Sequence, residues 1–369
     1  MISNYTVRPP EERSKGKEKD LFTRLLISTV PYKGDDFAEI VRKVVFIGAV
    51  IAFAITGGIL IKDVSGEIVQ KYVVTPQLQE IKEQASSGNL NLEQEEIKEI
   101  KSEKPFIREE MMTLYSENPD LIGWINIGGE SKLIDLPVVQ TVDNSKYLNT
   151  DFYGGSSKSG TIFADYRNDF TKGKAPDFTI LYGHNTTSST AFSKLSRYYY
   201  DKDNPEEGAD KMISFYQKHP VFTFDTLAQK STYKVFAVCL FNTEEKYGEV
   251  YNYLRYGQPF ADKEDFNGYI LDIMDRSCIL TDVDLTYGDE ILCLSTCYFP
   301  ISNDLHNTRC AIFARKVREG ESVEVDVSEV ERTYYWKGWK QLEDAGISSA
   351  YAKRTWDVSK LLSYEETSN

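Results

Sequence analysis

Cysteine, histidine and net positive charge are all scarce in this chain of 369 residues, and each shortage narrows what the protein can be. Five cysteines are too few, and odd in number, for a fold built on disulfides, so at least one thiol is free or pairs with another chain. A formal net charge of −14 argues against a nucleic-acid partner, because binding a polyanion requires clustered Lys and Arg. The content of 41% hydrophobic and 13% aromatic residues is ample for one well-packed domain with appendages.

One long apolar run, Val44 to Ile61, carries no charge and is about long enough to cross a bilayer as a helix. Arg42 and Lys43 precede the run, whereas the two charges that follow it cancel, so the positive-inside rule places the N-terminus in the cytoplasm. The alternatives are a cleaved signal peptide, which would usually be shorter and nearer the start, and a buried core helix. We therefore expect a single-pass protein of the cell membrane whose large C-terminal part lies outside the cell.

Changes in composition predict five segments along the chain. Residues 1–43 are polar and mixed in charge and read as a cytoplasmic tail, followed by the transmembrane helix at 44–61. Residues 62–117 predict a stalk and N-terminal helices, because the stretch from Thr75 to about Glu117 is rich in Glu, Lys, Gln and Leu. Residues 118–320 form the main domain, and residues 321–369 form a C-terminal appendage.

The main domain consists of short β-branched and aromatic runs separated by Gly, Asn and Asp, which is typical of a β-barrel or sandwich. Two segments have apolar residues three or four positions apart and predict helical inserts, at "STAFSKLSRYY" and at "DFNGYILDIMDRS". The second insert precedes the run "EILCLSTC", which contains two cysteines.

These two cysteines could be a disulfide pair, a metal site, two core thiols, or a nucleophile with an inert neighbour. If the run is one strand, Cys293, Ser295 and Cys297 share a face, and the two cysteine Cα atoms lie about 13 Å apart. A disulfide cannot span that distance. A zinc site usually needs closely spaced ligand pairs, and although Cys310 and His306 could complete one, no second close pair is present. We therefore predict no metal and no cofactor.

Cys297 stands at the end of the apolar run, where a thiol can be exposed enough to act as a nucleophile. On the next predicted strand Arg309 and Cys310 point to opposite faces, so an arginine that faces Cys297 leaves Cys310 on the other side. A base or acid would have to come from three histidines. His219 precedes a proline in a turn, and the residues alone leave His184, in "TILYGHNT", and His306 as equal candidates.

From about residue 118 to 317 the chain resembles the sortases, membrane-anchored cysteine transpeptidases of Gram-positive bacteria, and most closely their class B. The matching stretches occur in order: "GWINI", "PVVQ", "YLNTDFYG", "SGTIFADYRND", "TILYGHN", "LSTC" and an arginine on the following strand. The resemblance implies a mostly β fold: a closed sortase-type β-barrel with N-terminal helices and a helix before the catalytic strand, preceded by one transmembrane helix.

The resemblance also implies roles for particular residues. It makes His184 the catalytic histidine, Cys297 the nucleophile and Arg309 the essential arginine, and it removes His306 from contention. Ser295 and Thr296 match the family's signature and are expected to line the substrate groove. The chain departs from the family in two ways: Cys293 stands where the signature begins with threonine, and Tyr298 and Phe299 stand where many class B members carry an acidic residue.

A sortase of this class would cleave the sorting signal of secreted surface proteins and transfer the acyl group to an amine of a peptidoglycan precursor. The expected partners are thus a sorting-signal peptide, that amine, and the membrane through residues Val44 to Ile61. Three alternatives stay open on the sequence: a pilus-polymerising sortase that uses a pilin lysine, a membrane-bound cysteine peptidase, and a non-enzymatic surface scaffold.

Overall fold

The computed structural model describes residues 28–186, 190–199, 210–245, 250–255, 258–298, 308–328 and 330–332. The chain divides into two units, Met1–Val64 and Ser65–Asn369, and each is described by itself.

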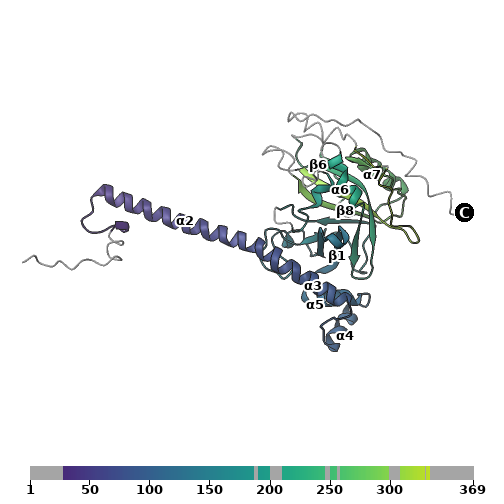
Figure 1. The fold of residues 1–369 in the computed structure, drawn as a ribbon, viewed down its shortest axis with the longest axis horizontal. Helices are drawn as coiled ribbons and strands as arrows, with labels where there is room; N and C mark the ends of the chain where they lie inside the picture. Colours follow the sequence, from purple (N-terminus) through teal and green to yellow (C-terminus); the bar gives the residue numbers. More distant parts are fainter. Residues whose placement is uncertain are drawn as a thin grey trace, which may run out of the picture. The chain divides into compact units, whose positions relative to one another are not determined.

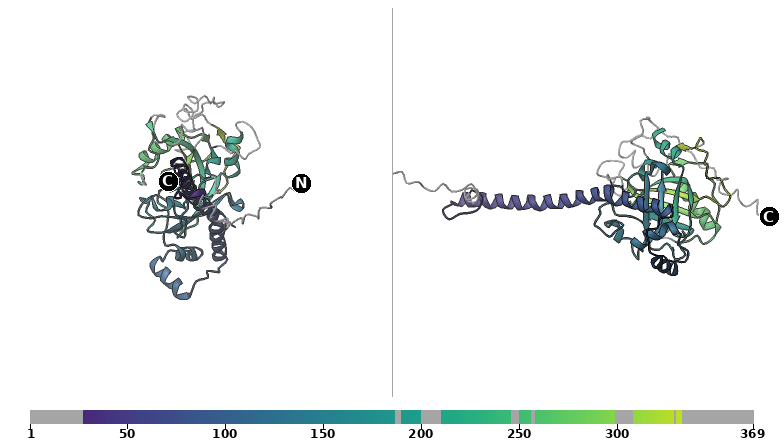
Figure 2. Two further views of the ribbon diagram at one scale, coloured as in Figure 1. Left: turned by 90° about the vertical axis from the view of Figure 1, so that its left-hand side faces the viewer. Right: turned by 60° about the horizontal axis from the view of Figure 1, so that its bottom comes forward.

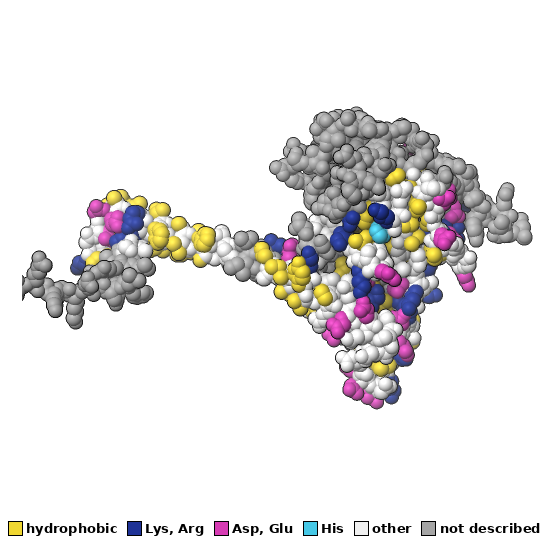
Figure 3. Space-filling view, in the orientation of Figure 1, with side chains coloured by type: hydrophobic (Ala, Val, Ile, Leu, Met, Phe, Trp, Pro, Cys, Tyr) yellow, Lys and Arg dark blue, Asp and Glu magenta, His cyan; other side chains and the backbone are white. Residues whose placement is uncertain are grey.

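Helix α2 (Phe37–Val69) contains the predicted apolar run and provides most of the described part of the first unit (Figure 1). Its stretch Phe37–Gly58 is, among the described residues, the one helical segment long and apolar enough to cross a membrane. Apolar side chains gather along this helix, whereas acidic and basic side chains are interspersed over the second unit (Figure 3). Val44, Phe46 and Phe53 are among its exposed apolar residues.

Short helices precede the barrel, as predicted. They are η1 (Gln70–Val74), α3 (Thr75–Ser86), α4 (Gln94–Glu103) and α5 (Glu109–Glu117). A reciprocal capping box between Glu93 and Glu96 starts α4. Leu78 of α3 and Met112 of α5 are buried in one apolar cluster with Trp124 of the barrel, so these helices pack on the outside of the β-sheet.

Eight of the described strands close into a barrel in the order β1-β2-β3-β4-β8-β9-β6-β5, with β5 returning to β1 (Figure 2). The strands are β1 (Leu121–Ile127), β2 (Ile134–Val139), β3 (Ile162–Ala164), β4 (Phe178–Tyr182), β5 (Val221–Thr226), β6 (Thr232–Asn242), β8 (Ile291–Tyr298) and β9 (Thr308–Lys316). The pairs β2–β3 and β4–β8 are parallel, and the other pairs are antiparallel. The predicted closed barrel is therefore confirmed.

Side chains of β8 alternate between two cores, because successive strand residues face opposite sides of the sheet. Leu292 and Leu294 fill the barrel interior. Ile291 and Cys293 face outward against α7 (Lys263–Asp275), whose Ile270 is completely buried. The predicted helix before this strand is thus present, and it covers the outer face of β8.

The other predicted insert is shorter than expected, since only the 3₁₀ turn η4 (Leu195–Tyr198) forms there. Ala191, near its start, has a left-handed backbone (φ 48°) and forms a bridge with Asn185, so a right-handed helix cannot include Ala191. A helix that the sequence did not indicate, α6 (Asp210–Lys218), adds Phe215 and Tyr216 to the interior core.

Beyond β9 the chain stays attached to the barrel. Val330 is buried in the interior core, and the short strand β10 (Glu331–Arg332) pairs with β7 (Ile279–Leu280). Most of the predicted C-terminal appendage lies outside the described residues, so the domain boundaries stay predictions.

Candidate active site

The topology of the barrel brings the predicted catalytic residues to one edge. Strands β4 and β8 are parallel neighbours, so the segments that follow them emerge side by side: His184 follows β4, and Cys297 lies near the end of β8. Strand β9 runs antiparallel to β8, and Arg309 is the direct partner of Cys297 in the ladder. Because directly paired residues project to the same face, Arg309 lies beside the thiol and Cys310 faces the interior core.

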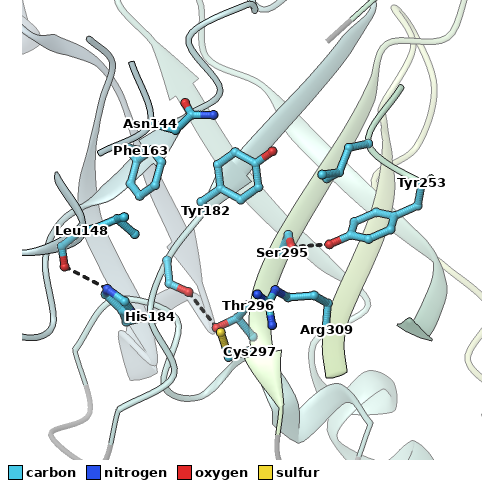
Figure 4. A pocket seen from close by; sticks show the side chains of 12 residues that line it. Asn144, Leu148, Phe163, Tyr182, His184, Tyr253, Ser295, Thr296, Cys297 and Arg309 are labelled. Atoms are coloured by element: carbon cyan, nitrogen blue, oxygen red, sulfur yellow. Dashed lines mark hydrogen bonds between the residues drawn. The ribbon is translucent and has the colours of Figure 1, made fainter. Parts of the chain in front are cut away.

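All five predicted site residues line a single cavity of about 320 Å³ (Figure 4). The lining residues are Asn144, Leu148, Phe163, Tyr182, Gly183, His184, Tyr253, Leu254, Ser295, Thr296, Cys297 and Arg309. The seven that we did not single out from the sequence come from segments far apart along the chain. Of these, Leu148, Phe163, Tyr182 and Gly183 lie within the quoted motifs, so the motifs carried a signal for them that spacing alone did not.

The two cysteines of β8 differ in how far their side chains are exposed to solvent. Cys297 is partly exposed at the cavity, whereas Cys293 is completely buried among the aromatic residues under α7. Burial raises the pKa of the Cys293 thiol well above its usual value. Of the two thiols on this face, Cys297 is therefore the one that a substrate can reach.

His184 is held by a backbone carbonyl. Its Nε2 lies 2.8 Å from the carbonyl oxygen of Leu148, as Figure 4 shows. Since a carbonyl can only accept a hydrogen bond, Nε2 carries the proton, and Nδ1 is left for proton transfer. The other candidate from the sequence, His306, lies outside the described residues.

The loop that carries His184 is tied on both sides to the strand that carries Cys297. The Thr296 hydroxyl donates to the carbonyl of Gly183 (2.7 Å), and the Asn185 amide donates to the carbonyl of Cys297 (2.9 Å). A Cβ atom at Gly183 would lie 2.7 Å from the ring of Phe192, so glycine is required for this path of the backbone. The separation of histidine and cysteine is thereby set by short, direct contacts.

Ser295 and Thr296 form part of the cavity wall, but both are nearly buried, at 3% and 2% exposure. The Ser295 hydroxyl is 2.8 Å from the hydroxyl of Tyr253, whose pKa is raised by burial, and the Thr296 hydroxyl is bonded to Gly183. Their visible contribution is therefore to hold neighbouring groups in place.

Arg309 is partly exposed, and its guanidinium extends from β9 into the cavity beside Thr296 and Cys297 (Figure 4). Its described hydrogen bond is a long one, 3.4 Å from Nη1 to the carbonyl of Thr308. Among the described residues no carboxylate forms an ion pair with Arg309, so most of its donors can reach a bound substrate.

No group of three or more His, Cys, Asp or Glu residues able to hold a metal ion occurs in the part of the chain that the structure describes. The chemistry that the cavity offers is that of a thiol, an imidazole and a guanidinium. Together these groups suit nucleophilic attack on a carbonyl carbon with stabilisation of the resulting oxyanion.

Comparison with known proteins identifies relatives over the barrel. Sortase B of Staphylococcus aureus is 32% identical to this chain over 191 residues, which cover 52% of this chain and 68% of the relative. Sortase B of Listeria monocytogenes is 31% identical over 191 residues with the same coverage. A crystal structure of Staphylococcus aureus Sortase B aligns with 61% of this chain and 94% of its own, at 28% identity and a TM-score of 0.45. No protein-family model matches the chain.

Proposed function

Because the chain belongs to the sortase B family of cysteine transpeptidases, we propose that it cleaves the sorting signal of secreted surface proteins and joins the acyl part to a cell-wall amine. The observation that supports this most directly is the shared cavity, in which the partly exposed thiol of Cys297 lies opposite Arg309 and near His184.

The first half of the reaction forms a thioester. The Cys297 thiolate attacks the carbonyl carbon of the scissile peptide bond, and the carbonyl oxygen becomes an oxyanion. Arg309 donates hydrogen bonds to the oxyanion or to the adjacent peptide backbone, and a single such donor is worth about 3 kcal/mol of barrier. His184 gives a proton to the leaving amine as the C–N bond breaks, so the C-terminal part of the signal departs as a neutral amine.

The second half of the reaction reverses these roles. An incoming primary amine attacks the thioester carbon, His184 takes up the proton that the amine releases, and the C–S bond breaks to restore the thiolate. The product is a new amide, with no net oxidation or reduction. Resolution by an amine of a peptidoglycan precursor makes the protein an anchoring enzyme, whereas resolution by water would make it a peptidase.

The proposed cellular location of this reaction rests on helix α2. We propose that it anchors the protein in the membrane with the N-terminus in the cytoplasm and the barrel outside, where both substrates are found. Support comes from its apolar stretch Phe37–Gly58 and from Arg42 and Lys43 near its N-terminal end.

The test is mass spectrometry of the full-length protein in membrane vesicles, incubated with a panel of sorting-signal peptides. The amine acceptor is varied between a peptidoglycan stem-peptide amine, a lysine peptide and none. We expect an acyl adduct on Cys297 that an amine converts to an amide product. Preference for the lysine peptide would favour pilus assembly. Product formation that ignores the amine would indicate a peptidase, and the absence of any adduct would count against the proposed activity.

A further inference from the structure

The turn between β3 and β4 contains a carboxylate that lies behind the cavity wall. Asp165 is completely buried, at 0% exposure, and accepts five hydrogen bonds. Three come from Arg167: from its backbone N (3.0 Å), its Nε (2.7 Å) and its Nη2 (2.6 Å). The other two come from the hydroxyl of Tyr182 (2.9 Å) and the Nδ2 amide of Asn144 (3.1 Å). Tyr182 and Asn144 both line the cavity, whereas Asp165 does not.

The protonation states of Asp165 and Tyr182 determine which of these groups donates and which accepts in the cluster. Burial by itself would raise the pKa of Asp165, but the hydrogen bonds from Arg167 and Tyr182 lower it below its usual value, so the group is an ionised acceptor. Burial, together with the neighbouring Asp165 charge, raises the pKa of Tyr182, so its hydroxyl stays protonated and donates. A neutral side chain at position 165 could not accept from all five donors.

Asn144 is held at both ends of its amide. Its Nδ2 donates to Asp165, and its Oδ1 accepts from the backbone N of Tyr166 (3.0 Å). The terminal amide therefore cannot turn over, and a fixed N–H of Asn144 is left for a ligand in the cavity. Figure 4 shows Asn144 and Tyr182 across the cavity from Cys297, where they would meet the peptide away from its reacting bond.

We propose that Asp165 is a positioning residue that fixes Asn144 and Tyr182 in the orientation needed to bind the peptide. This inference rests on the proposed function, since it concerns the peptide that the cavity accepts. Loss of Asp165 frees the Asn144 amide and the Tyr182 hydroxyl while leaving the contacts of Cys297, His184 and Arg309 unchanged. The effect falls on peptide binding and not on the reaction at the thiol.

The kinetic test compares full-length Asp165→Ala with Asp135→Ala. Asp135 is a matched control because it is also buried, at 5% exposure, and accepts from Trp124 Nε1 (2.6 Å) and Asn126 Nδ2 (3.0 Å), neither of which lines the cavity. For Asp165→Ala we expect the KM for the peptide to rise about tenfold with kcat changed by less than about threefold. Alkylation of Cys297 by iodoacetamide should keep its rate, and Asp135→Ala should keep its KM.

Asp165→Asn should recover most of the peptide affinity. Its carbonyl oxygen can still accept from Asn144 and Tyr182, and the Arg167 side chain, 27% exposed, can bond to water instead. An unchanged KM in folded Asp165→Ala, or an equal rise in Asp135→Ala, would overturn the inference.

A second measurement is made on the wild-type protein and does not depend on activity. In protein labelled with ¹⁵N-asparagine, the side-chain amide signal of Asn144 is assigned by its loss in Asn144→Gln. We expect one of its two protons to be protected from exchange with solvent. Rapid exchange of both would refute the positioning role. Protection without any acyl adduct from the peptide panel would instead show that the proposed function fails while the positioning of Asn144 holds.

Discussion

Arg309 and Arg315 lie on the same face of β9 at opposite ends of the strand, and their surroundings differ completely. Arg315 is fully buried and forms ion pairs with Asp284 and Glu321, both at 2.6 Å. Arg309 lies at the cavity and, among the described residues, has no carboxylate partner. Burying a guanidinium requires compensating charges, whereas a partly exposed one can keep its donors for a ligand. The comparison shows that one strand face carries a structural arginine at one end and a candidate catalytic arginine at the other.

The two cysteines on β8 show the same contrast, because Cys293 is buried and Cys297 lines the cavity. The largest expected effect comes from replacing Cys297. We expect Cys297→Ala to abolish acyl-enzyme formation, because no other exposed thiol lines the cavity. Cys293→Ser is the control and should be tolerated with a small loss of stability, since Cys293 only packs under α7. Intact-mass measurement after incubation with peptide reads out both variants. A thioester trapped on Cys297→Ala, or equal loss in Cys293→Ser, would contradict the assignment.

The next test concerns His184, which also lines the cavity. His184→Ala should lower kcat/KM for transpeptidation by about 10² to 10⁴, which is the usual contribution of a general acid and base. His306→Ala should retain activity. Rates are compared under saturating amine, and both variants are checked for an unchanged melting temperature. Loss of turnover in a folded His306→Ala protein would mean that the wrong histidine has been chosen.

For Arg309→Ala we expect kcat/KM to fall by about 10² to 10³, the effect of removing one oxyanion donor. The melting temperature should stay close to that of the wild type, because no ion pair among the described residues is lost. A large fall in stability with little change in the rate per folded molecule would show that Arg309 is structural, like Arg315.

Arg315→Ala should have the opposite outcome. Removing the buried guanidinium leaves the carboxylates of Asp284, Glu321 and Asp289 with less positive charge nearby, and the side chain of Asp289 is only 3% exposed. We therefore expect a loss of about 3 kcal/mol in the free energy of unfolding. Below the new melting temperature, kcat/KM should match the wild type. Urea unfolding and a peptide assay on the same sample check both expectations.

The smallest effect concerns the response to acid. Burial alone would raise the pKa of Glu321, but hydrogen bonds from Arg315 and Lys234 lower it well below its usual value of 4.5. A carboxylate with a lowered folded-state pKa contributes stability above the unfolded-state pKa and loses it as the pH falls. Wild type should therefore exceed Glu321→Gln in urea midpoint at pH 7, and the difference should shrink below about pH 4. A constant difference would mean that Glu321 does not titrate as described.

Residue alternation along the strands allowed much of the site to be predicted. It placed Cys293 and Cys297 on one face and separated Arg309 from Cys310, and the observed register agrees. The local pattern was less reliable at "STAFSKLSRYY", where apolar spacing predicted a helix and only one 3₁₀ turn forms. There Ala191, which is bridged to Asn185, has a left-handed backbone that a helix cannot include.

The sequence by itself determined the strands, their two faces, the apolar helix and the motifs that identify the family, because these depend on residues close together in the chain. Only the tertiary structure decided that α7 covers Cys293, that Arg315 forms buried ion pairs, and that Asp165 holds Asn144 and Tyr182. These outcomes depend on contacts between separate segments of the chain. The position of His184 beside Cys297 depends in addition on the parallel pairing of β4 with β8, which joins residues more than a hundred positions apart, such as Asn185 and Cys297. Long-range pairing leaves no periodic signal in a single sequence.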